Sequence, residues 1–386
     1  MDQDRIIKRI SSLKLRNWRN FQRVDVLLEQ RTFLIGPNAA GKSNLLDAIR
    51  FLRDIVSDGG GFQEAVRSRG GLRELRCFAA RTKPNILIEL SLGDDDGDVF
   101  RYELEFGSKK GDATPSVVKE RAFFGNLRVL NRPDDNDRED SKRLTQTALE
   151  QVNANSDFRE IAEFLKEVRY LHVVPEVVRD PTRASGRDDP FGGDLIERIA
   201  RTSERKRKAR LKRMEDALRI AVPQLRDLKL ETDKRGVPHL LANYKHWRRS
   251  GAWQREDRFS DGTLRLLGLI WSLQEPGGTI LLEEPEMSLN TGVVAQLAPL
   301  IARATLRSNR QSLISTHSAD LLSNGVSPKE VLLLVPTEEG TEVKSTRSFK
   351  KLVALVEAGM PLGEAVMPET KSTQTDMLAD LDLSNA

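Results

Sequence analysis

Hydrophobic residues in this chain gather in short runs that polar and glycine-rich segments separate. The run at 279–282 is apolar without alternation, which predicts a strand buried on both faces within a parallel sheet. The runs at 32–35 and 312–316 have the same character, and the chain turns glycine-rich or polar directly after each. A further apolar run lies at 331–335. This pattern predicts an α/β fold with buried strands.

Two longer segments alternate apolar and polar residues instead. They lie at 86–92 and 99–106, and the alternation predicts an antiparallel hairpin. The residues that join them, 93–98, are glycines and aspartates. The aspartates permit a metal site as one interpretation, but glycine and aspartate are also the ordinary residues of a turn, which is the interpretation that we favour.

Helical spacing of apolar residues appears at 158–171 and again at 194–221, where Pro223 ends it. A further helix is expected near 352–357. The acidic, proline-containing segment 132–142 predicts a mobile loop. No apolar heptad lasts more than a few turns, so the pattern predicts a compact head without a long coiled coil.

Length and composition narrow the class of protein. The chain has 386 residues, and its motifs span 36–317, which predicts one large unit with an inserted subdomain. It has no run of eighteen apolar residues and no apolar signal core at its start, so we expect a cytoplasmic protein that does not bind membranes. Its single cysteine, Cys77, excludes an internal disulfide and is expected to be a small buried residue.

A glycine-rich segment joins the apolar run at 32–35 to a helical pattern at 44–49. Strand, loop and helix in this order, with the spacing G-x-x-x-x-G-K-S, predict a phosphate loop for a nucleoside triphosphate with Mg²⁺. Lys42 would reach the outer phosphates, and the Ser43 hydroxyl would bind Mg²⁺. The alternative is an ordinary glycine-rich turn. The candidate nucleotide-binding residues here are Gly36, Pro37, Asn38, Ala39, Ala40, Gly41, Lys42, Ser43 and Asn44.

Two carboxylates follow the apolar run at 279–282. Ligands bind at the carboxyl ends of strands in open α/β sheets, so Glu283 and Glu284 are expected beside the phosphate loop. Glu283 would hold the Mg²⁺ shell, and Glu284 would polarise the attacking water. The alternative is an acidic surface turn after a strand.

Two more polar segments add to this site. His317 follows the run at 312–316, where a neutral imidazole can contact the γ-phosphate and orient the water. Ser260 and Gly262 open an amphipathic helix, whose free N–H groups favour a phosphate. One nucleotide needs no second phosphate site in its own chain, so this site is expected to contact the nucleotide of another copy.

These four segments, in this order, resemble the ATP-binding-cassette (ABC) ATPases of the SMC, RecF and OLD group, and most of all the stand-alone "AAA family ATPase" type with an S-D-G-T signature. The segment 13–21 is similar to the first strand and turn of RecF-like heads. Residues 69–72, 175–181 and 340–341 look like further landmarks of that type. The resemblance implies a head with a mixed sheet core, an antiparallel β subdomain and a helical insertion.

The resemblance also implies roles for individual residues, with ATP and Mg²⁺ as cofactors. Lys42 and Ser43 become the phosphate and magnesium ligands, and Glu283 becomes the acidic strand residue. Glu284 becomes the catalytic base and His317 the switch histidine. Ser260 and Gly262 become the signature contacts made to a second chain, and residues 288–290 the short loop that faces the partner.

Three departures from the family pattern stand out. Glu283 occupies a position where most relatives have Asp, which lengthens the arm towards the metal by one methylene. Asp261 stands where the commoner signature has a second glycine, so its carboxylate must point away from the γ-phosphate or repel it. The family's magnesium-sensing glutamine has no clear counterpart: Gln63 is the nearest candidate, and a surface glutamine is the interpretation that we favour.

The motifs divide the chain into four parts. Residues 1–130 hold the first part of the head with the phosphate loop and the hairpin, and 131–250 a mostly helical insertion. Residues 251–366 hold the second part of the head with the signature, the acidic strand and His317. Residues 367–386 are expected to form a polar, acidic tail, and we expect no nuclease domain in the same chain.

Two segments of the insertion are candidates for nucleic-acid binding. From Arg198 to Arg213 the chain has nine basic residues and one acid, and the middle of this helix is expected to leave the core. A solvated helix face is the alternative, and the totals of 62 basic and 58 acidic residues do not decide between them. The second candidate mixes aromatic residues and cations, which could stack on bases or form an edge hairpin; it comprises Tyr244, Lys245, His246, Trp247, Arg248, Arg249, Trp253 and Arg255.

The expected function is that of an ATPase that closes as a homodimer around two ATP molecules, alone or within a higher assembly. One hypothesis is a switch that engages DNA in repair or in defence against phage. The other is a regulatory scaffold that binds and controls a separate nuclease or toxin subunit. A transporter ATPase is a distant third, because such chains are shorter and carry a different signature.

Overall fold

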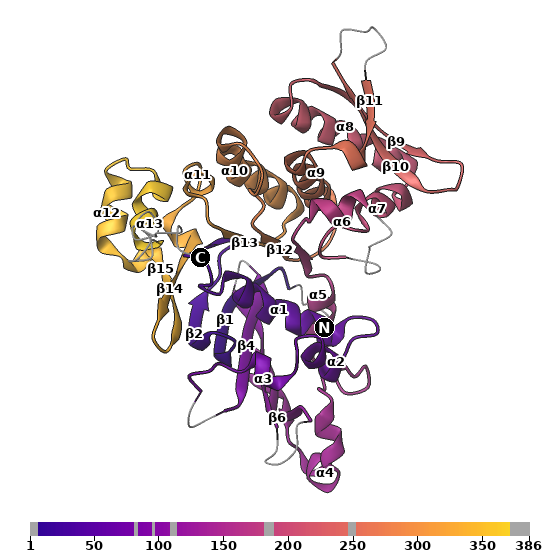
Figure 1. Ribbon diagram of the computed structural model, residues 1–386. Helices are drawn as coiled ribbons and strands as arrows, with labels where there is room; N and C mark the ends of the chain where they lie inside the picture. Colours follow the sequence, from indigo (N-terminus) through magenta and orange to yellow (C-terminus); the bar gives the residue numbers. More distant parts are fainter. Residues whose placement is uncertain are drawn as a thin grey trace, which may run out of the picture.

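The computed structural model describes residues 7–80, 84–94, 97–108, 114–180, 189–245 and 252–370. A core sheet lies at the middle of the molecule, with an antiparallel sheet below it and helices above it (Figure 1). Among the described residues, no helix is long and apolar enough to cross a membrane.

The core sheet has six strands in the order β15-β14-β3-β13-β12-β8. The strands from β14 to β8 run parallel, and only β15 is antiparallel to its neighbour. The buried strands predicted at 32–35, 279–282 and 312–316 are confirmed as its centre. The strand bounds are β3 Arg31–Ile35, β8 Arg169–Leu171, β12 Ile280–Glu283, β13 Ser312–Thr316, β14 Val331–Thr337 and β15 Gly340–Ser345.

The second sheet is antiparallel throughout, in the order β2-β1-β4-β5-β6-β7. The predicted hairpin is confirmed as β4 and β5, which pair along their whole length. Asp95 and Asp96, in the acidic segment between them, lie outside the described residues. The strand bounds are β1 Arg9–Trp18, β2 Phe21–Leu27, β4 Ile86–Asp94, β5 Gly97–Gly107, β6 Ser116–Phe124 and β7 Leu127–Arg132.

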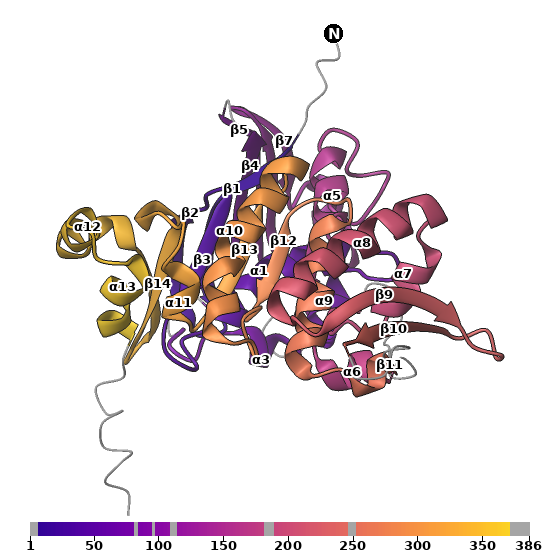
Figure 2. The same cartoon turned by 90° about the horizontal axis from the view of Figure 1, so that it is seen from above.

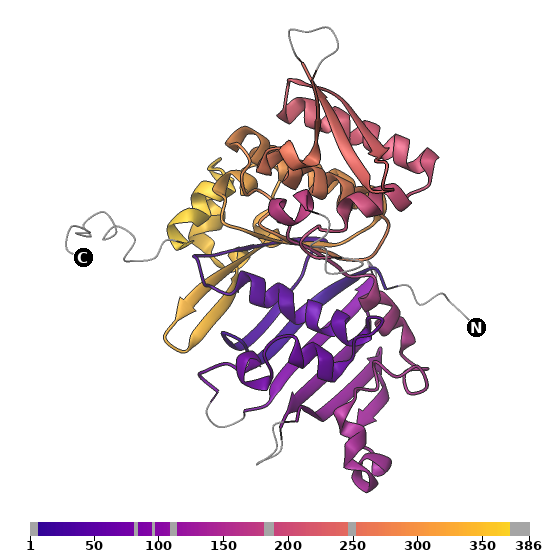
Figure 3. The ribbon, with the colours of Figure 1, turned by 45° about the vertical axis from the view of Figure 1, so that its right-hand side comes forward.

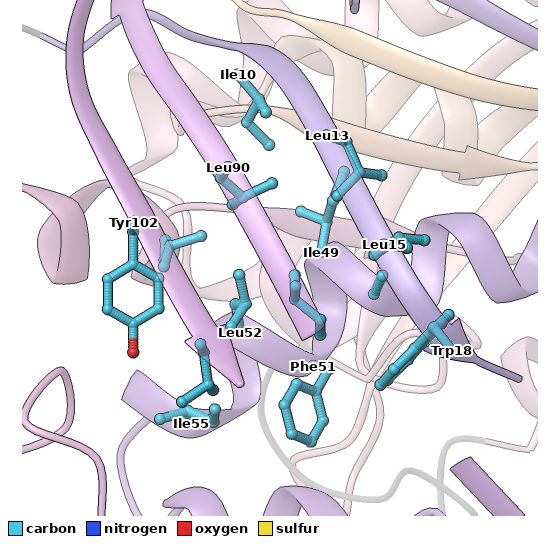
Figure 4. Packing of buried hydrophobic residues seen from close by; sticks show 14 of the residues in the cluster. Ile10, Leu13, Leu15, Trp18, Ile49, Phe51, Leu52, Ile55, Leu90 and Tyr102 are labelled. Atoms are coloured by element: carbon cyan, nitrogen blue, oxygen red, sulfur yellow. The ribbon is translucent and has the colours of Figure 1, made fainter. Parts of the chain in front are cut away.

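Helix α1 (Lys42–Val56) lies between the two sheets and joins them into one core. Its apolar side chains, Phe51 and Leu52 among them, pack against residues of β1 and β4 such as Leu13 and Leu90 (Figure 4). The bounds of the other helices in this half are α2 Phe62–Arg67, α3 Leu72–Leu75, α4 Asp135–Glu139, the 3₁₀ helix η1 Ser141–Thr145 and α5 Arg159–Lys166.

A second core covers the opposite face of the core sheet. Side chains alternate across each strand, so Leu281 and Leu313 face α1 while Leu282 and Ile314 face α9 (Asp261–Gln274) and α10 (Thr291–Ser308). Figure 2 shows these two helices lying across β12 and β13. A three-stranded sheet, β11-β10-β9, extends this layer, with α8 beside it (Figure 3). Both faces of the predicted parallel strands are therefore buried.

The remaining bounds complete the described chain. They are α6 Pro175–Arg179, α7 Leu195–Arg201, α8 Glu204–Ala221, β9 Leu225–Thr232, β10 Pro238–Tyr244, β11 Ala252–Arg255, α11 Ala319–Leu322, α12 Lys350–Glu357 and α13 Leu362–Thr370, with 3₁₀ turns η3 Glu256–Arg258, η4 Pro328–Glu330 and η5 Thr346–Ser348. The longest helices of the described residues, α8 and α10, have 18 residues each. Beyond Thr370, the polar tail lies outside the described residues.

Two helix predictions need correction. The helix expected at 194–221 is broken into α7 and α8, because Thr202 and Ser203 are extended and the Arg207 guanidinium donates to the carbonyls of Ala200 and Thr202 at the end of α7. The helix expected at 158–171 ends with α5, and its last residues form β8 at the edge of the core sheet. There, pairing with β12 replaces the helical hydrogen bonds.

The mobile loop expected at 132–142 is also wrong. The segment folds into α4 and η1 around the side chain of Arg132, which is almost fully buried. Arg132 donates to Glu120 at 3.0 Å and to both carboxylate oxygens of Asp137 at 2.9 Å. A buried cation with two carboxylate partners orders a segment that composition alone suggests is loose.

Candidate nucleotide-binding site

The core sheet brings the predicted site residues to one edge. Strands β3, β13 and β12 are adjacent and parallel, so the segments that follow their carboxyl ends emerge side by side. The phosphate loop follows β3, Glu284 follows β12 and His317 follows β13. Residues almost 300 positions apart in sequence therefore meet at the position where open α/β sheets bind their ligands.

The phosphate loop wraps around the amino end of α1. Gly41 has a left-handed backbone with φ of 93°, and a β-carbon there would lie 2.2 Å from the side-chain nitrogen of Asn20. No side chain caps α1, so its first N–H groups are directed at the loop without a side-chain partner. A helix start of this kind favours an anion, as the sequence predicts for the triphosphate.

Lys42 is the first residue of α1, and its side chain folds back over the loop. Its ammonium donates to the carbonyls of Gly36 at 3.0 Å and Pro37 at 3.1 Å, and it lies 3.3 Å from His317 Nδ1. Burial lowers the pKa of Lys42, against the opposing effect of the carboxylates of Glu284, Glu286 and Glu283. The Lys42 ammonium is thus surrounded by carbonyl oxygens of the loop, at a position where it could also donate to phosphate oxygens.

Glu283 accepts hydrogen bonds from two hydroxyl groups. Ser43, on α1, donates to one carboxylate oxygen, and Tyr170, on β8, donates to the other. Burial raises the pKa of Glu283, which a nearby cation would reverse. A hydroxyl and a carboxylate in contact form an oxygen donor set that suits Mg²⁺, which takes few protein ligands and completes its shell with phosphate and water. The residues present therefore fit the expected metal.

Glu284 and His317 form the third part of the site. Glu284 has a left-handed backbone with φ of 44°, and its amide donates to the Ser315 carbonyl at 3.1 Å. Its carboxylate lies 2.9 Å from His317 Nε2. A non-glycine residue held in this conformation marks a local constraint, and here the carboxylate that follows β12 faces the imidazole that follows β13.

Glu286 fixes the segment that carries His317. It accepts from the Thr316 hydroxyl at 2.6 Å and from the His317 amide at 3.0 Å. Burial raises the pKa of Glu286. This carboxylate therefore holds the ends of two neighbouring strands together below the predicted catalytic pair.

The predicted signature residues lie apart from this cluster. Ser260 caps α9 and accepts from the amide of Thr263 at 3.3 Å. Gly262 lies so close to the loop at 288–290 that a β-carbon would be 2.4 Å from the Ser288 carbonyl oxygen. Within the described ranges, no hydrogen bond or ion pair joins Ser260, Asp261 or Gly262 to Lys42, Ser43, Glu283, Glu284 or His317.

The sequence landmarks at 69–72 and 340–341 contact α1 and Asn20, which lie next to the phosphate loop. Arg69 pairs with Asp47 and Asp54, both on α1, at 2.8 Å each. A β-carbon on Gly340 would lie 2.5 Å from the carbonyl oxygen of Asn20, so only glycine allows this approach. Both landmarks therefore support the phosphate loop and its helix.

Asn20, Tyr170 and His172 also shape the site, and the sequence did not single them out. Tyr170 and His172 lie on either side of Leu171, the last residue of β8. Leu171 pairs with Leu282 of β12, so the residues that follow them, His172 and Glu283, lie next to each other. Burial and then the charge of Arg265 lower the pKa of His172. The signal for β8 was hidden because three residues at a sheet edge carry no periodicity of their own.

Gln63 does not lie in the cluster. Its amide donates to the carbonyls of Pro115 at 2.8 Å and Thr145 at 2.7 Å, so it ties α2 to the antiparallel half. The surface interpretation is corrected as well, because these two bonds hold Gln63 partly buried. The polar side chains that contact Glu283 are Ser43 of α1 and Tyr170 of β8.

The basic helix is only partly free. The N-terminal half of α8 leaves the core, as predicted, but Lys208 pairs with Glu204, Lys212 pairs with Glu215, and Arg210 lies over the Trp271 ring. In the other candidate segment, Trp253 is 42% exposed, with the Lys229 ammonium 4.0 Å from its ring centre. His246, Trp247, Arg248 and Arg249 lie outside the described residues.

The mixed core sheet, the antiparallel sheet packed on α1, and the convergence of phosphate loop, acidic strand end and histidine define an ABC-type ATPase of the SMC and RecF group. Residues 31–324 match the family described as "AAA domain, putative AbiEii toxin, Type IV TA system". The chain belongs to this AAA domain family.

Individual relatives agree with this assignment. Part of the chain is 47% identical over 139 residues to the DNA replication and repair protein RecF of Roseiflexus castenholzii. The matched region covers 31% of this chain and 33% of that protein. The matched part thus spans about a third of the relative.

Solved structures show the same fold. The SMC head bound to the C-winged helix domain of ScpA has a TM-score of 0.53 at 15% identity, over 87% of this chain and 96% of that one. The Smc head domain derived from Pyrococcus furiosus, with an extended coiled coil, has a TM-score of 0.51 at 14% identity, over 90% and 99%. At such identities the likeness concerns the fold alone.

Proposed function

We propose that this protein hydrolyses ATP with Mg²⁺ as a homodimer that closes around two nucleotides. The observation that carries the proposal is the division of the predicted residues into two separate groups. Lys42, Glu284 and His317 converge on the phosphate loop, whereas Ser260 and Gly262 open another helix and, among the described residues, have no hydrogen bond or ion pair to them. A second copy supplies the simplest partner for that helix end.

The chain's own residues suit the chemistry. Lys42 and the N–H groups at the start of α1 bind the phosphates, and Ser43 with Glu283 holds the metal, which neutralises phosphate charge when bound. Glu284 accepts the proton of the attacking water as general base. His317, whose Nε2 lies 2.9 Å from that carboxylate, orients the attacking water.

Two variants test the dimer. Glu284→Gln keeps the shape of the side chain but cannot take a proton, so we expect it to accumulate as an ATP-bound dimer without turnover. Lys42→Ala removes the phosphate contact and is expected to stay monomeric in ATP. The measurement is molar mass by light scattering with and without ATP and Mg²⁺, with Glu338→Gln, an exposed turn residue, as the control. Equal monomeric behaviour of Glu284→Gln and Lys42→Ala in ATP would refute the scheme.

The biological role follows from what the closed dimer engages. The first candidate is DNA, in repair or in defence against phage, supported by the RecF relative and by Arg205 and Lys206, which are exposed. The second is a separate nuclease or toxin subunit that the ATPase scaffolds and restrains, supported by a family description that names a toxin and a toxin–antitoxin system.

Steady-state ATP hydrolysis separates these candidates. Wild type and Glu284→Gln are compared with and without duplex and single-stranded DNA, at low and moderate salt. Stimulation by DNA that fades as salt rises favours the first candidate, because phosphate contacts release counterions. Hydrolysis that the substitution abolishes but that DNA leaves unchanged favours a protein partner.

A further inference from the structure

Asp261 is the residue by which this signature departs from the commoner one, and its carboxylate has a definite partner. Arg179, the last residue of α6, donates through Nη2 to Asp261 Oδ1 and, at 2.8 Å, to the carbonyl of Phe259. We propose that Arg179 is a positioning residue, which neutralises Asp261 and turns its carboxylate aside so that the start of α9 can receive the γ-phosphate of a nucleotide bound by a second copy. This inference rests on the proposed function.

The position of Asp261 makes such a device necessary. It is the first residue of α9, between Ser260 and Gly262, and its side chain is 46% exposed. A carboxylate in the first turn of a helix is attracted by the same N–H groups that would bind a phosphate. An unpaired Asp261 would therefore compete with the γ-phosphate for these groups and also repel it.

The geometry shows how the competition is avoided. One guanidinium nitrogen contacts both the carboxylate and the Phe259 carbonyl, which lies on the chain just before the cap. This double contact fixes the carboxylate on the side of α6. Ser260, whose hydroxyl caps Thr263, and Gly262, packed against Ser288, keep their positions on the rest of the helix start.

A purely structural role for the ion pair is the alternative. Helix α6 is anchored independently, because Pro175 and Val178 are buried and Val178 belongs to the second core. Arg179 itself lies at the end of α6, and its guanidinium bonds go to the start of α9 and to the Phe259 carbonyl. Loss of its side chain should therefore leave α6 in place and change the charge at the start of α9.

The test uses the 386-residue chain with Glu284→Gln as the parent, so that ATP hydrolysis does not dissociate the dimer during the measurement. Arg179→Ala, Asp261→Asn and the two together are added to it, with the exposed Arg347→Ala as the control. Two quantities are measured: the ATP concentration that half-saturates dimer formation, and the affinity of a fluorescent ATP analogue at a protein concentration too low for dimers.

We expect Arg179→Ala to raise the ATP concentration for dimer formation by about tenfold or more, because it leaves one charge of a pair facing an anion. Adding Asp261→Asn should restore it to near the parent value, since the repelling charge is gone. Nucleotide affinity of the monomer and thermal stability should stay close to those of the parent in every variant.

Each other outcome counts against the inference. Dimer formation by Arg179→Ala at the parent's ATP concentration would show that the pair has no role in closure. A double variant as impaired as Arg179→Ala, with unchanged thermal stability, would mean that Arg179 acts through something other than Asp261. If the parent itself fails to dimerise, the proposed function falls and this inference falls with it.

Discussion

Asn20 lies at the turn between β1 and β2, and one amide there connects three remote segments. Its Nδ2 donates to the Ala40 carbonyl at 2.9 Å and to the Thr341 hydroxyl at 2.8 Å, while its Oδ1 accepts from Asn44 at 2.8 Å. The phosphate loop is therefore held from below by a side chain that never needs to touch the nucleotide.

Asn20→Ala should weaken the loop more than the fold. It removes three hydrogen bonds, to the Ala40 carbonyl, the Thr341 hydroxyl and the Asn44 amide. We therefore expect a loss of about 1–3 kcal/mol in unfolding free energy and a several-fold loss in ATP affinity. Denaturant unfolding and nucleotide titration measure the two effects. Asn324→Ala, which removes one exposed bond to Ala295, is the control, and equal effects of both variants would contradict this role.

At the scale of elements, α1 is held by charge as well as by its apolar face. Arg69, in the turn after α2, pairs with Asp47 and Asp54 two turns apart on α1, and its guanidinium also lies over the Phe51 ring. Burial opposes the charged form of Asp47, but Arg69 and then Arg19 outweigh it and lower its pKa. The helix that presents Lys42 thus depends on a residue beyond its own sequence.

Arg69→Met keeps much of the apolar volume but removes the cation that Asp47 and Asp54 share, which leaves Arg19 beside Asp47 and Arg53 beside Asp54. Breaking a buried pair in this way costs about 3–5 kcal/mol, so a large drop in melting temperature is expected. Arg67→Met is a matched control, because the Arg67 side chain is 81% exposed. A comparable loss in both variants would place the effect outside the ion pairs.

Glu150 gives the antiparallel half a dependence on pH. It accepts from the amides of Phe62 at 2.5 Å and Thr147 at 3.1 Å, and burial raises its pKa from 4.5 to about 7. A carboxyl with a higher pKa in the folded state holds its proton more tightly there. Its contribution to stability is therefore greatest below its unfolded pKa and declines as pH rises towards about 7.

Glu150→Gln cannot ionise, so its melting temperature should fall less than that of the wild type between about pH 5 and about pH 8. Thermal unfolding at several pH values measures this difference. Glu139→Gln, an exposed residue of α4, should follow the wild type. Parallel pH profiles for wild type and Glu150→Gln would contradict the assignment.

At the scale of the whole molecule, one sheet serves two cores. Leu34, Leu281 and Leu313 face the core around α1, while Phe33, Leu282 and Ile314 face the core around α9 and α10. A movement of either layer therefore acts on strands that end at the predicted nucleotide-binding site. The exposed part of α8 belongs to the second layer, which also holds α9 with Ser260 and Gly262 at its start. If closure of the proposed dimer shifts this layer, the exposed surface of α8 would move together with α9.

If that surface binds DNA, Arg205 and Lys206 carry the contact, because Lys208 and Lys212 are already paired with acids of α8. The other cations nearby also have partners: Arg207 donates to the Ala200 carbonyl, Arg210 lies over the Trp271 ring and Arg213 donates to Gln274. Arg205→Glu with Lys206→Glu should weaken binding to DNA of any sequence. The slope of log affinity against log salt concentration should fall in magnitude by about 2. Lys350→Glu with Lys351→Glu, on exposed α12 positions, is the charge-matched control. Equal weakening by both pairs would indicate unspecific charge, and no weakening would remove α8 from the interface.

The sequence by itself determined the elements whose signals are local. A glycine spacing between an apolar run and a helix marks the phosphate loop, and continuous apolarity marks β12 and β13 as buried parallel strands. Parallel pairing then forces Glu284 and His317 to the same edge as Lys42. The family pattern added the landmarks, although not the contacts that explain them.

Only the tertiary structure decided the features that depend on a distant partner. Strand β8 replaces the end of a predicted helix because β12 supplies its hydrogen bonds. The segment after Arg132 is ordered because Glu120 and Asp137 surround a buried cation. The Asp261 carboxylate at the start of α9 is paired because Arg179 comes from another helix to meet it. In each case the stabilising partner is remote in sequence, and a local pattern carries no information about which remote group will be there.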